Sequence, residues 1–300
     1  SRNMDKNTRK LREKVQERWN HLESLGYKVI FVGLYGSQNY GLDDEGSDID
    51  VKAIVLPTLK DLMIRRSISK VYELEDGLTE VKDLASYSKI ITKGNPAFIE
   101  PFHSKYKMGN IELINLFSSV EVNLHAALGM VCQKRELIKK GNGTDKQRKE
   151  IGYDPKNFHH IVRLAHIIED PMPFHFYKKG TVEHRVILSY KRGGYLSKKY
   201  FVETNRESAL AVADEIIEYS KEVLKGYRYT PNLDIVEEAT ELSIKLMKMS
   251  LFNDYDDLAA RQVRTFGGNV PKVDRNQFPI LEERNGEDFT YIVYSYLEIL

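Results

Sequence analysis

Cysteine is almost absent from this sequence, since Cys132 is the single one in 300 residues. One cysteine excludes an intrachain disulfide, and we expect a reducing, cytoplasmic location. No apolar run approaches the roughly 20 residues that a membrane-spanning helix needs, so no membrane partner is expected. The charged N-terminus also lacks the apolar centre of a secretory signal peptide.

An excess of charge of one sign is also missing, because 45 Lys and Arg nearly balance 44 Asp and Glu. That total alone indicates no polyanionic partner. The charges are nevertheless unevenly distributed: residues 131–200 carry a net charge of +9, and residues 201–300 a net charge of −8. We expect phosphate contacts in the basic middle segment, although solvated helix faces would give the same composition.

The N-terminal third alternates between helix and strand patterns. An amphipathic helix is predicted over residues 8–25. The apolar residues that recur on its one face are Leu11, Val15, Trp19 and Leu22. Strands are predicted over 28–37, 47–57, 68–76 and 78–83. Asp76-Gly77 is a hairpin signal between the last two strands, and a helix near 83–93 ends at Gly94-Asn95-Pro96.

From about residue 111 the pattern becomes helical. The predicted helices cover 111–140, 155–170, 205–225 and 232–250. Segment 171–204 has no clear pattern, and a final hairpin is expected around Asn285-Gly286. Together these patterns predict an α+β fold, with a small unit of strands and helices over 1–110 and a mainly helical unit over 111–300.

Two aspartates separated by one residue lie at the start of the second predicted strand. Because side chains alternate along a strand, Asp48 and Asp50 are expected on one face. Ile49 and Val51 are then expected on the opposite, core-facing side. Two carboxylates about 7 Å apart along a strand can converge on a hard cation. The alternative is an exposed edge strand, which would show the same alternation.

A Gly-Ser pair ends the preceding strand. Gly36 allows close backbone approach and unusual dihedral angles, and Ser37 adds a hydroxyl and a backbone N–H at the turn. Backbone donors at such a turn can bind phosphate oxygens. Together with the two aspartates, the pair indicates a phosphate site beside a metal site. Nucleoside triphosphates need both, because Mg²⁺ binds through carboxylates and substrate phosphates.

The stretch GSQNYGLDDEGSDIDVK, residues 36–52, resembles the nucleotidyltransferase superfamily that includes DNA polymerase β. Within that superfamily it most resembles the bacterial and phage nucleotidyltransferase family linked to RNA repair. The residues that match the family's pattern are Gly36, Ser37, Tyr40, Gly41, Ser47, Asp48 and Asp50. The chain has Gln38 where the family often has Arg, and Tyr40 where it usually has Trp.

Two later stretches extend the resemblance to about residues 28–200. Residues 83–100 resemble the family's helix that ends in Lys-x-Asn-Pro and is followed by Glu. The matching residues there are Lys93, Asn95, Pro96 and Glu100. Residues 156–164 resemble the family's His-x-x-Arg-Leu helix through His160 and Arg163.

The resemblance implies that a third carboxylate on a neighbouring strand joins Asp48 and Asp50 as catalytic and metal-binding residues. Glu80 fits that place, because its predicted strand can lie beside the face of the two aspartates. Asp83 is the alternative. Its position at the start of a predicted helix favours a structural role as the N-cap.

Basic side chains are the candidates for binding the nucleotide. Lys52 lies two residues after Asp50 on the same strand face, where it would reach phosphate or pair with an acid. His160 and Arg163 share one helical face, and are expected to contact nucleotide or, alternatively, to hydrogen-bond within the core. Further candidates for the triphosphate or an RNA backbone are Lys93, Lys191 and Arg192.

The resemblance implies a polymerase β-like catalytic domain over 1–110 and a helical substrate-binding domain over 111–300. The implied activity transfers an NMP from an NTP, with ATP expected, to a hydroxyl acceptor, with Mg²⁺ or Mn²⁺ as cofactor. RNA, for example tRNA, is the favoured acceptor through the basic segment 131–200. Nucleotidylation of a protein or small molecule, cyclic-oligonucleotide synthesis, and a non-catalytic nucleotide- or RNA-binding module are the alternatives.

Overall fold

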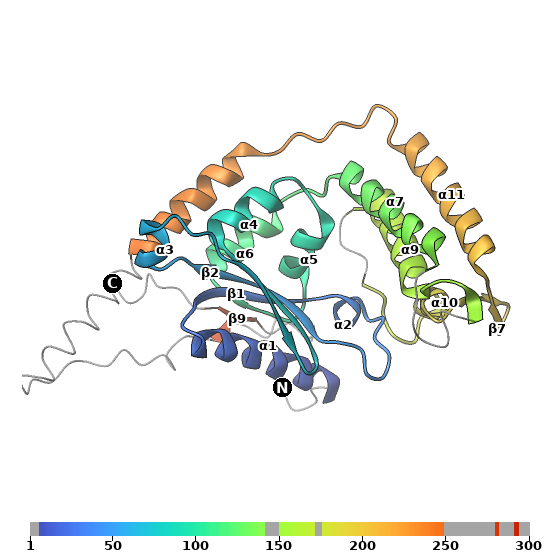
Figure 1. Cartoon of the computed structure of the whole chain (residues 1–300), viewed down its shortest axis with the longest axis horizontal. Coiled ribbons are helices and arrows are strands. Elements are labelled where there is room, and N and C mark those ends of the chain that lie inside the picture. Colours follow the sequence, from blue (N-terminus) through green and yellow to red (C-terminus); the bar gives the residue numbers. More distant parts are fainter. Residues whose placement is uncertain (1–5, 142–149, 172–175, 249–279, 282–290, 294–300) are drawn as a thin grey trace, which may run out of the picture.

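The computed structural model describes residues 6–141, 150–171, 176–248, 280–281 and 291–293. Its α+β fold is built on a mixed β-sheet that is packed with helices and followed by a mainly helical region (Figure 1). The strands are β1 Lys28–Tyr35, β2 Asp50–Leu56, β3 Ser69–Leu74, β4 Gly77–Asp83, β5 Lys107–Gly109, β8 Ile280–Leu281 and β9 Tyr291–Val293. Their order across the sheet is β3-β4-β2-β1-β5-β9-β8.

Strand β2 lies at the centre of the site-bearing part of the sheet. It pairs antiparallel with β1, which sets Asp50 opposite Tyr35, and parallel with β4, which sets Lys52 beside Glu80. Strands β3 and β4 form the predicted antiparallel hairpin. Strands β8 and β9 are also antiparallel, while the expected turn between them lies outside the described residues.

Helix α1, Lys6–Ser24, covers one face of the sheet, as its amphipathic pattern predicts (Figure 1). The predicted apolar face is buried and packs with core residues of β1, β2 and β4. Arg18 of α1 donates to the Ile49 carbonyl at 3.1 Å and to the Asp76 carboxylate at 2.7 Å. It therefore ties the β3–β4 turn to the start of β2.

Three helices cover the other face: α4 Leu84–Ile91, α5 Pro96–His103 and α6 Ile111–Ser118 (Figure 1). Alternation along β2 directs Ile54 and Leu56 to this face, and Val51 and Val55 to the α1 face. Asp50 and Lys52 have the same parity as Ile54, so they belong to the face covered by α4 and α5. The candidate acids and the α5 side chains therefore share one side of the sheet.

The structure differs from the predicted helices in two places. The single helix expected over 111–140 is divided into α6 and α7, Leu124–Lys140. Asn123 caps α7 and its N–H bonds to the Gly94 carbonyl, a long-range contact that the local pattern does not contain. Helix α5, which was not predicted, begins directly after the expected breaker because Asn95 acts as its N-cap.

The helical region lies at the far end of the sheet, beyond the short helix α2, Ser37–Tyr40 (Figure 1). Its helices are α7, α9 Pro155–Glu169, α10 Val182–Lys191 and α11 Arg206–Val223. The unassigned segment 171–204 contains α10 and the antiparallel hairpin of β6 Gly194–Ser197 and β7 Tyr200–Glu203. Residues 233–248 form the last helix described, where 232–250 was predicted.

One hydrophobic cluster crosses residue 110, since it contains Phe102 of α5, Leu113 of α6 and Ile161 of α9. The division into domains at this residue stays a prediction. The short helix α3, Leu59–Met63, follows β2. None of the helices within the described ranges has the length and apolar character needed to cross a membrane.

Candidate active site

The turn after β1 brings the Gly-Ser pair against the second aspartate. Gly36 has φ +86° and ψ −162°, a conformation that side-chain-bearing residues rarely adopt. A Cβ added to Gly36 would lie 3.7 Å from Oδ2 of Asp50. The predicted phosphate turn and the predicted metal ligand are therefore neighbours, although the sequence separates them by a loop.

Glu100 of α5 fixes this turn through hydrogen bonds. Its carboxylate accepts hydrogen bonds from the Gly36 N–H at 3.1 Å, from the Asn39 amide at 2.8 Å and from the Tyr40 hydroxyl. Only 2% of Glu100 is exposed. Burial raises the pKa of its carboxyl, while nearby Arg163 and the three hydrogen bonds act in the opposite direction.

Glu100 already accepts the hydrogen bond that the Gly36 N–H can donate. The Ser37 hydroxyl is therefore the group of the Gly-Ser pair that remains available to a ligand. The Ser37 hydroxyl makes no hydrogen bond within the described part of the chain. Sequence reasoning matched Glu100 to a motif and gave it no role. The signal was an acid within the apolar run Ala97–Phe102, which is costly unless the carboxylate has partners.

The two aspartates differ in their surroundings. Asp48 is exposed and precedes β2, so it lies just outside the strand in which it was predicted. Asp50 is half-buried, and its Oδ1 accepts the Leu78 N–H at 2.9 Å. Burial raises the pKa of Asp50, as does the negative charge of Asp48, against the effect of the Leu78 hydrogen bond. The core-facing side chains predicted between and after them, Ile49 and Val51, are buried.

Lys52 and Glu80 pair with each other across β2 and β4. Their Nζ and Oε2 atoms are 2.5 Å apart, and Lys52 is only 4% exposed. The Lys52 ammonium also lies 4.2 Å from the ring centroid of Tyr35 and 4.7 Å from that of Phe98. In this structure Lys52 therefore makes the acid pair that was the alternative to a phosphate contact.

The third-carboxylate candidates are now distinguished by their contacts. Asp83 caps α4 by accepting the Ser86 N–H at 2.8 Å, and accepts the Ile68 N–H at 2.7 Å. Its predicted role as an N-cap is confirmed. Glu80 faces the same side of the sheet as Asp50, with its carboxylate held by Lys52.

No group of three His, Cys, Asp or Glu side chains in the described ranges is arranged to hold a metal ion. The metal site of Asp48, Asp50 and Glu80 thus stays a prediction. The donor chemistry of the two aspartates fits a hard cation, because both supply carboxylate oxygens and they lie two residues apart. Glu80 would join them only by leaving Lys52.

Two acids of the loop before β2 form ion pairs with basic side chains of the helical region. Asp43 pairs with Lys179 at 3.0 Å, and Asp44 pairs with Arg192 at 2.8 Å. Lys191 lies 3.6 Å from Asp44 and donates to the Leu42 carbonyl at 2.6 Å. Two of the expected phosphate contacts, Lys191 and Arg192, are therefore used to attach the loop to α10. Lys93 is exposed.

Arg163 and His160 of α9 reach the other end of α2. The Arg163 guanidinium lies 3.7 Å from the ring centroid of Tyr40, and its Nη2 is 3.4 Å from Nδ1 of His160. Burial lowers the pKa of His160, and the charges of His159 and Arg163 lower it further. The two predicted nucleotide-contacting residues thus lie together at the Tyr40 end of α2, where Arg163 contacts the Tyr40 ring.

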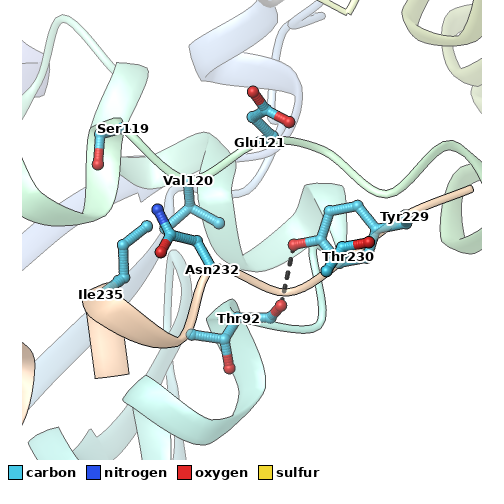
Figure 2. Close-up of a pocket in the computed structure, with 8 residues that line it drawn as sticks. All are labelled: Thr92, Ser119, Val120, Glu121, Tyr229, Thr230, Asn232 and Ile235. Carbon is cyan, nitrogen blue, oxygen red and sulfur yellow. Dashed lines mark hydrogen bonds between the residues drawn. The ribbon is translucent and has the colours of Figure 1, made fainter. Parts of the chain in front are cut away.

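A separate pocket of about 190 Å³ lies away from these residues. Figure 2 shows its lining, in which the Tyr229 hydroxyl donates to the Thr92 carbonyl at 2.9 Å. The other lining residues are Ser119, Val120, Glu121, Thr230, Asn232 and Ile235. None of the predicted site residues lines it, so it is not part of the candidate active site.

No family model matches the chain, and no curated protein matches it. Among solved structures, the chain is similar to a nucleotidyltransferase-like protein from Exiguobacterium sibiricum, with 13% sequence identity and a TM-score of 0.26. The similarity covers 81% of this chain and 91% of that one. A similarity at this TM-score carries no argument about fold family or function, so the assignment of function rests on the residues of the site.

Proposed function

We propose that the chain is a metal-dependent nucleotidyltransferase, which moves an NMP from an NTP to a hydroxyl acceptor and releases pyrophosphate. The observation that carries this proposal is the juxtaposition of Gly36 with the Asp50 carboxylate. A turn without a side chain lets phosphate approach the backbone closely. A carboxylate at that position is a ligand for the cation that accompanies a triphosphate.

Each site residue has a role in this proposal. Ser37 binds a phosphate oxygen through its hydroxyl, and Asp48 and Asp50, with Glu80, hold Mg²⁺ or Mn²⁺. When bound, the cation supplies Lewis-acid chemistry: it offsets phosphate charge and lowers the pKa of the attacking hydroxyl. Glu100 orients the turn through its hydrogen bond to the Gly36 N–H.

The transfer exchanges one phosphorus–oxygen bond for another. The acceptor oxygen bonds to the α-phosphorus, the bond from that phosphorus to the pyrophosphate oxygen breaks, and the hydroxyl proton passes to solvent. Little covalent chemistry is required of the protein, so positioning and charge stabilisation supply most of the catalysis. ATP is the expected donor, and Lys52 reaches phosphate only if Glu80 turns to the metal.

RNA is the proposed acceptor. The segment 131–200 has an excess of basic residues, and many of these side chains are exposed. They include Lys139, Lys140, Lys156, Lys178, Arg185, Lys198 and Lys199. Exposed Lys and Arg side chains are the contacts that bind a nucleic-acid backbone.

The test is incubation of the protein with each α-³²P-labelled NTP, Mg²⁺ or Mn²⁺, and total cellular RNA, followed by gel electrophoresis. Label on RNA, lost in Asp48→Ala and Asp50→Ala, is the expected result. Label on protein would overturn the RNA acceptor and leave the transferase. NTP binding without transfer to any acceptor would instead identify a nucleotide-binding module.

A further inference from the structure

A buried guanidinium without a matching anion lies beside the candidate active site. Arg163 is 6% exposed, and its Nε has no hydrogen-bond partner. Its contacts are the ring of Tyr40 and the imidazole of His160. No carboxylate in the described part of the chain lies within ion-pair distance of it.

Buried arginines are nearly always paired, because removing a charge from water is expensive. The Glu100 carboxylate interacts electrostatically with Arg163, and it accepts a hydrogen bond from the hydroxyl of Tyr40, on which Arg163 stacks. Stacking on a tyrosine stabilises a guanidinium by less than the cost of leaving a buried charge unpaired. The surroundings of Arg163 therefore lack an anion that the described part of the protein does not supply.

The side chains around Arg163 add charge of the same sign. Lys134 of α7 is half-buried, and it makes no hydrogen bond or ion pair with any described residue. Burial lowers the pKa of Lys134, and the charge of Arg163 lowers it further, while Asp154 raises it. Lys134, Lys191 and His159 also act on His160. Helices α7 and α10 both pack against α9, and they thus bring further basic side chains to the part of α9 that carries His160 and Arg163.

Two residues of this cluster already hydrogen-bond to backbone carbonyls and are left out of the proposed site. Lys191 donates to the Leu42 carbonyl, as described above. His159 is 1% exposed, and its Nδ1 donates to the Lys156 carbonyl at 2.5 Å. The Nε2 atom of His159 has no hydrogen-bond partner, but the residue is almost fully buried and offers a ligand little access. The residues proposed for the ligand are therefore Lys134, His160 and Arg163.

The position and charge of Lys134, His160 and Arg163 indicate the class of ligand that they would bind. Tyr40, over which Arg163 lies, is the last residue of α2, and Ser37 is the first. A group bound by the cluster is therefore one short helix away from the Gly-Ser turn. A doubly charged phosphoryl group accepts hydrogen bonds from arginine, lysine and an imidazole N–H together.

We propose that Lys134, His160 and Arg163 form a phosphate-binding subsite on the α7–α9 side of α2, distinct from the Gly-Ser turn. The inference rests on the proposed function for its place in the reaction. Its ligand is either the terminal phosphate of the NTP or a phosphate of the RNA acceptor. Both present the same phosphoryl oxygens, so binding measurements have to distinguish them.

The test measures binding of inorganic tripolyphosphate, of an NTP and of a short oligoribonucleotide by calorimetry, with no transfer required. Lys134→Gln and Arg163→Gln each remove one cation, and Lys89→Gln is the matched control, an exposed lysine on α4. Hydrogen bonds to charged groups contribute about 1.5–3 kcal/mol, so we expect affinity to fall about tenfold or more in the first two variants. The control should bind like the wild type.

The ligands separate the two sources. Weaker binding of tripolyphosphate and NTP alone assigns the subsite to the triphosphate tail. Weaker binding of the oligoribonucleotide alone assigns it to the acceptor. Unchanged binding of all three ligands by Lys134→Gln and Arg163→Gln would overturn the subsite.

Folding and catalysis are controlled separately. The melting temperature of each variant shows whether it folds, and if Arg163→Gln does not fold, Lys134→Gln and His160→Asn decide the result. Because the measurement is of binding, a protein that binds tripolyphosphate through Lys134 but transfers nothing would support the subsite and refute the transferase. Nucleotidyl transfer and ligand binding that are both unchanged in Lys134→Gln would support the transferase and refute the subsite.

Discussion

The residues around the two ends of α2 have opposite charges. At neither end is the charge matched by an ion pair among the residues discussed below. At the Gly36 end, Asp50 lies beside Asp48, and burial followed by the charge of Asp48 raises its pKa. At the Tyr40 end, Arg163 stacks without a carboxylate, and burial lowers the pKa of His160. Structural ion pairs elsewhere, such as Asp44 with Arg192, are complete. The difference fits the proposed function, in which the two ends of α2 bind a ligand that brings both a cation and phosphates.

Removing the acidic end should have the largest effect. Asp50→Asn keeps the size of the side chain but removes its charge, and with it the proposed metal site. Metal-ion catalysis contributes several kcal/mol, so we expect transfer of labelled NMP to fall about a thousandfold or more. The matched control is Asp43→Asn, an acid of the loop before β2 that pairs with Lys179. Equal losses in the two variants would show that Asp50 has no special role.

A second substitution determines whether Glu80 belongs to the acidic end. If Glu80 is the third carboxylate, Glu80→Gln should lower transfer about ten- to a hundredfold, the usual scale for losing a group that holds or orients a metal. Asp83→Ala should leave the turnover of the folded enzyme unchanged and lower stability by about 1 kcal/mol, because it removes the α4 N-cap. Steady-state transfer and denaturant unfolding measure the two effects. The reverse pattern would make Asp83 the third acid.

Breaking the link between the two ends tests Glu100, which bonds to residues at both ends of α2. Glutamine offers an N–H₂ where Glu100 accepts, so a donor would face another donor. We expect Glu100→Gln to lower the free energy of unfolding by about 2 kcal/mol and to raise the KM for NTP. Glu75→Gln, an exposed acid in the β3–β4 hairpin, is the control. Wild-type stability in Glu100→Gln would contradict the role of this carboxylate in holding the turn.

The smallest effect concerns pH at the basic end. Burial, followed by the charge of Arg163, lowers the pKa of His159 to about 3. An unfolded histidine titrates near 6.5, so below that pH the unfolded chain takes up a proton that the folded chain excludes. Stability is therefore lost as pH falls from about 6.5 towards about 3, with no contribution from His159 above 6.5.

Between pH 6.5 and pH 5.5 the loss from His159 is about 1 kcal/mol, from a full slope of 1.36 kcal/mol per pH unit. Urea unfolding at the two pH values, compared between wild type and His159→Gln, isolates this contribution. The variant should show the smaller decrease in stability. Identical decreases would mean that His159 accepts a proton in the folded protein.

Local elements were predictable because the interactions that form them lie within a few residues. The apolar face of α1, the Asp76-Gly77 turn and the N-cap role of Asp83 all follow from spacing or local chemistry. The break between α6 and α7 was not predicted. Asn123 is fixed by the Gly94 carbonyl, and no pattern of neighbouring residues records that contact.

The site was predictable only in part for the same reason. The sequence by itself placed Gly36 and Ser37 at a turn after a strand, and Asp48 and Asp50 at the start of the next. Only the tertiary structure brought Gly36 beside Asp50, paired Lys52 with Glu80, and seated Arg163 over Tyr40. Strand and turn propensities depend on neighbours along the chain. Charge balance depends on distance in space, and Glu100, 64 residues from the turn that it holds, is an example that no local pattern reveals.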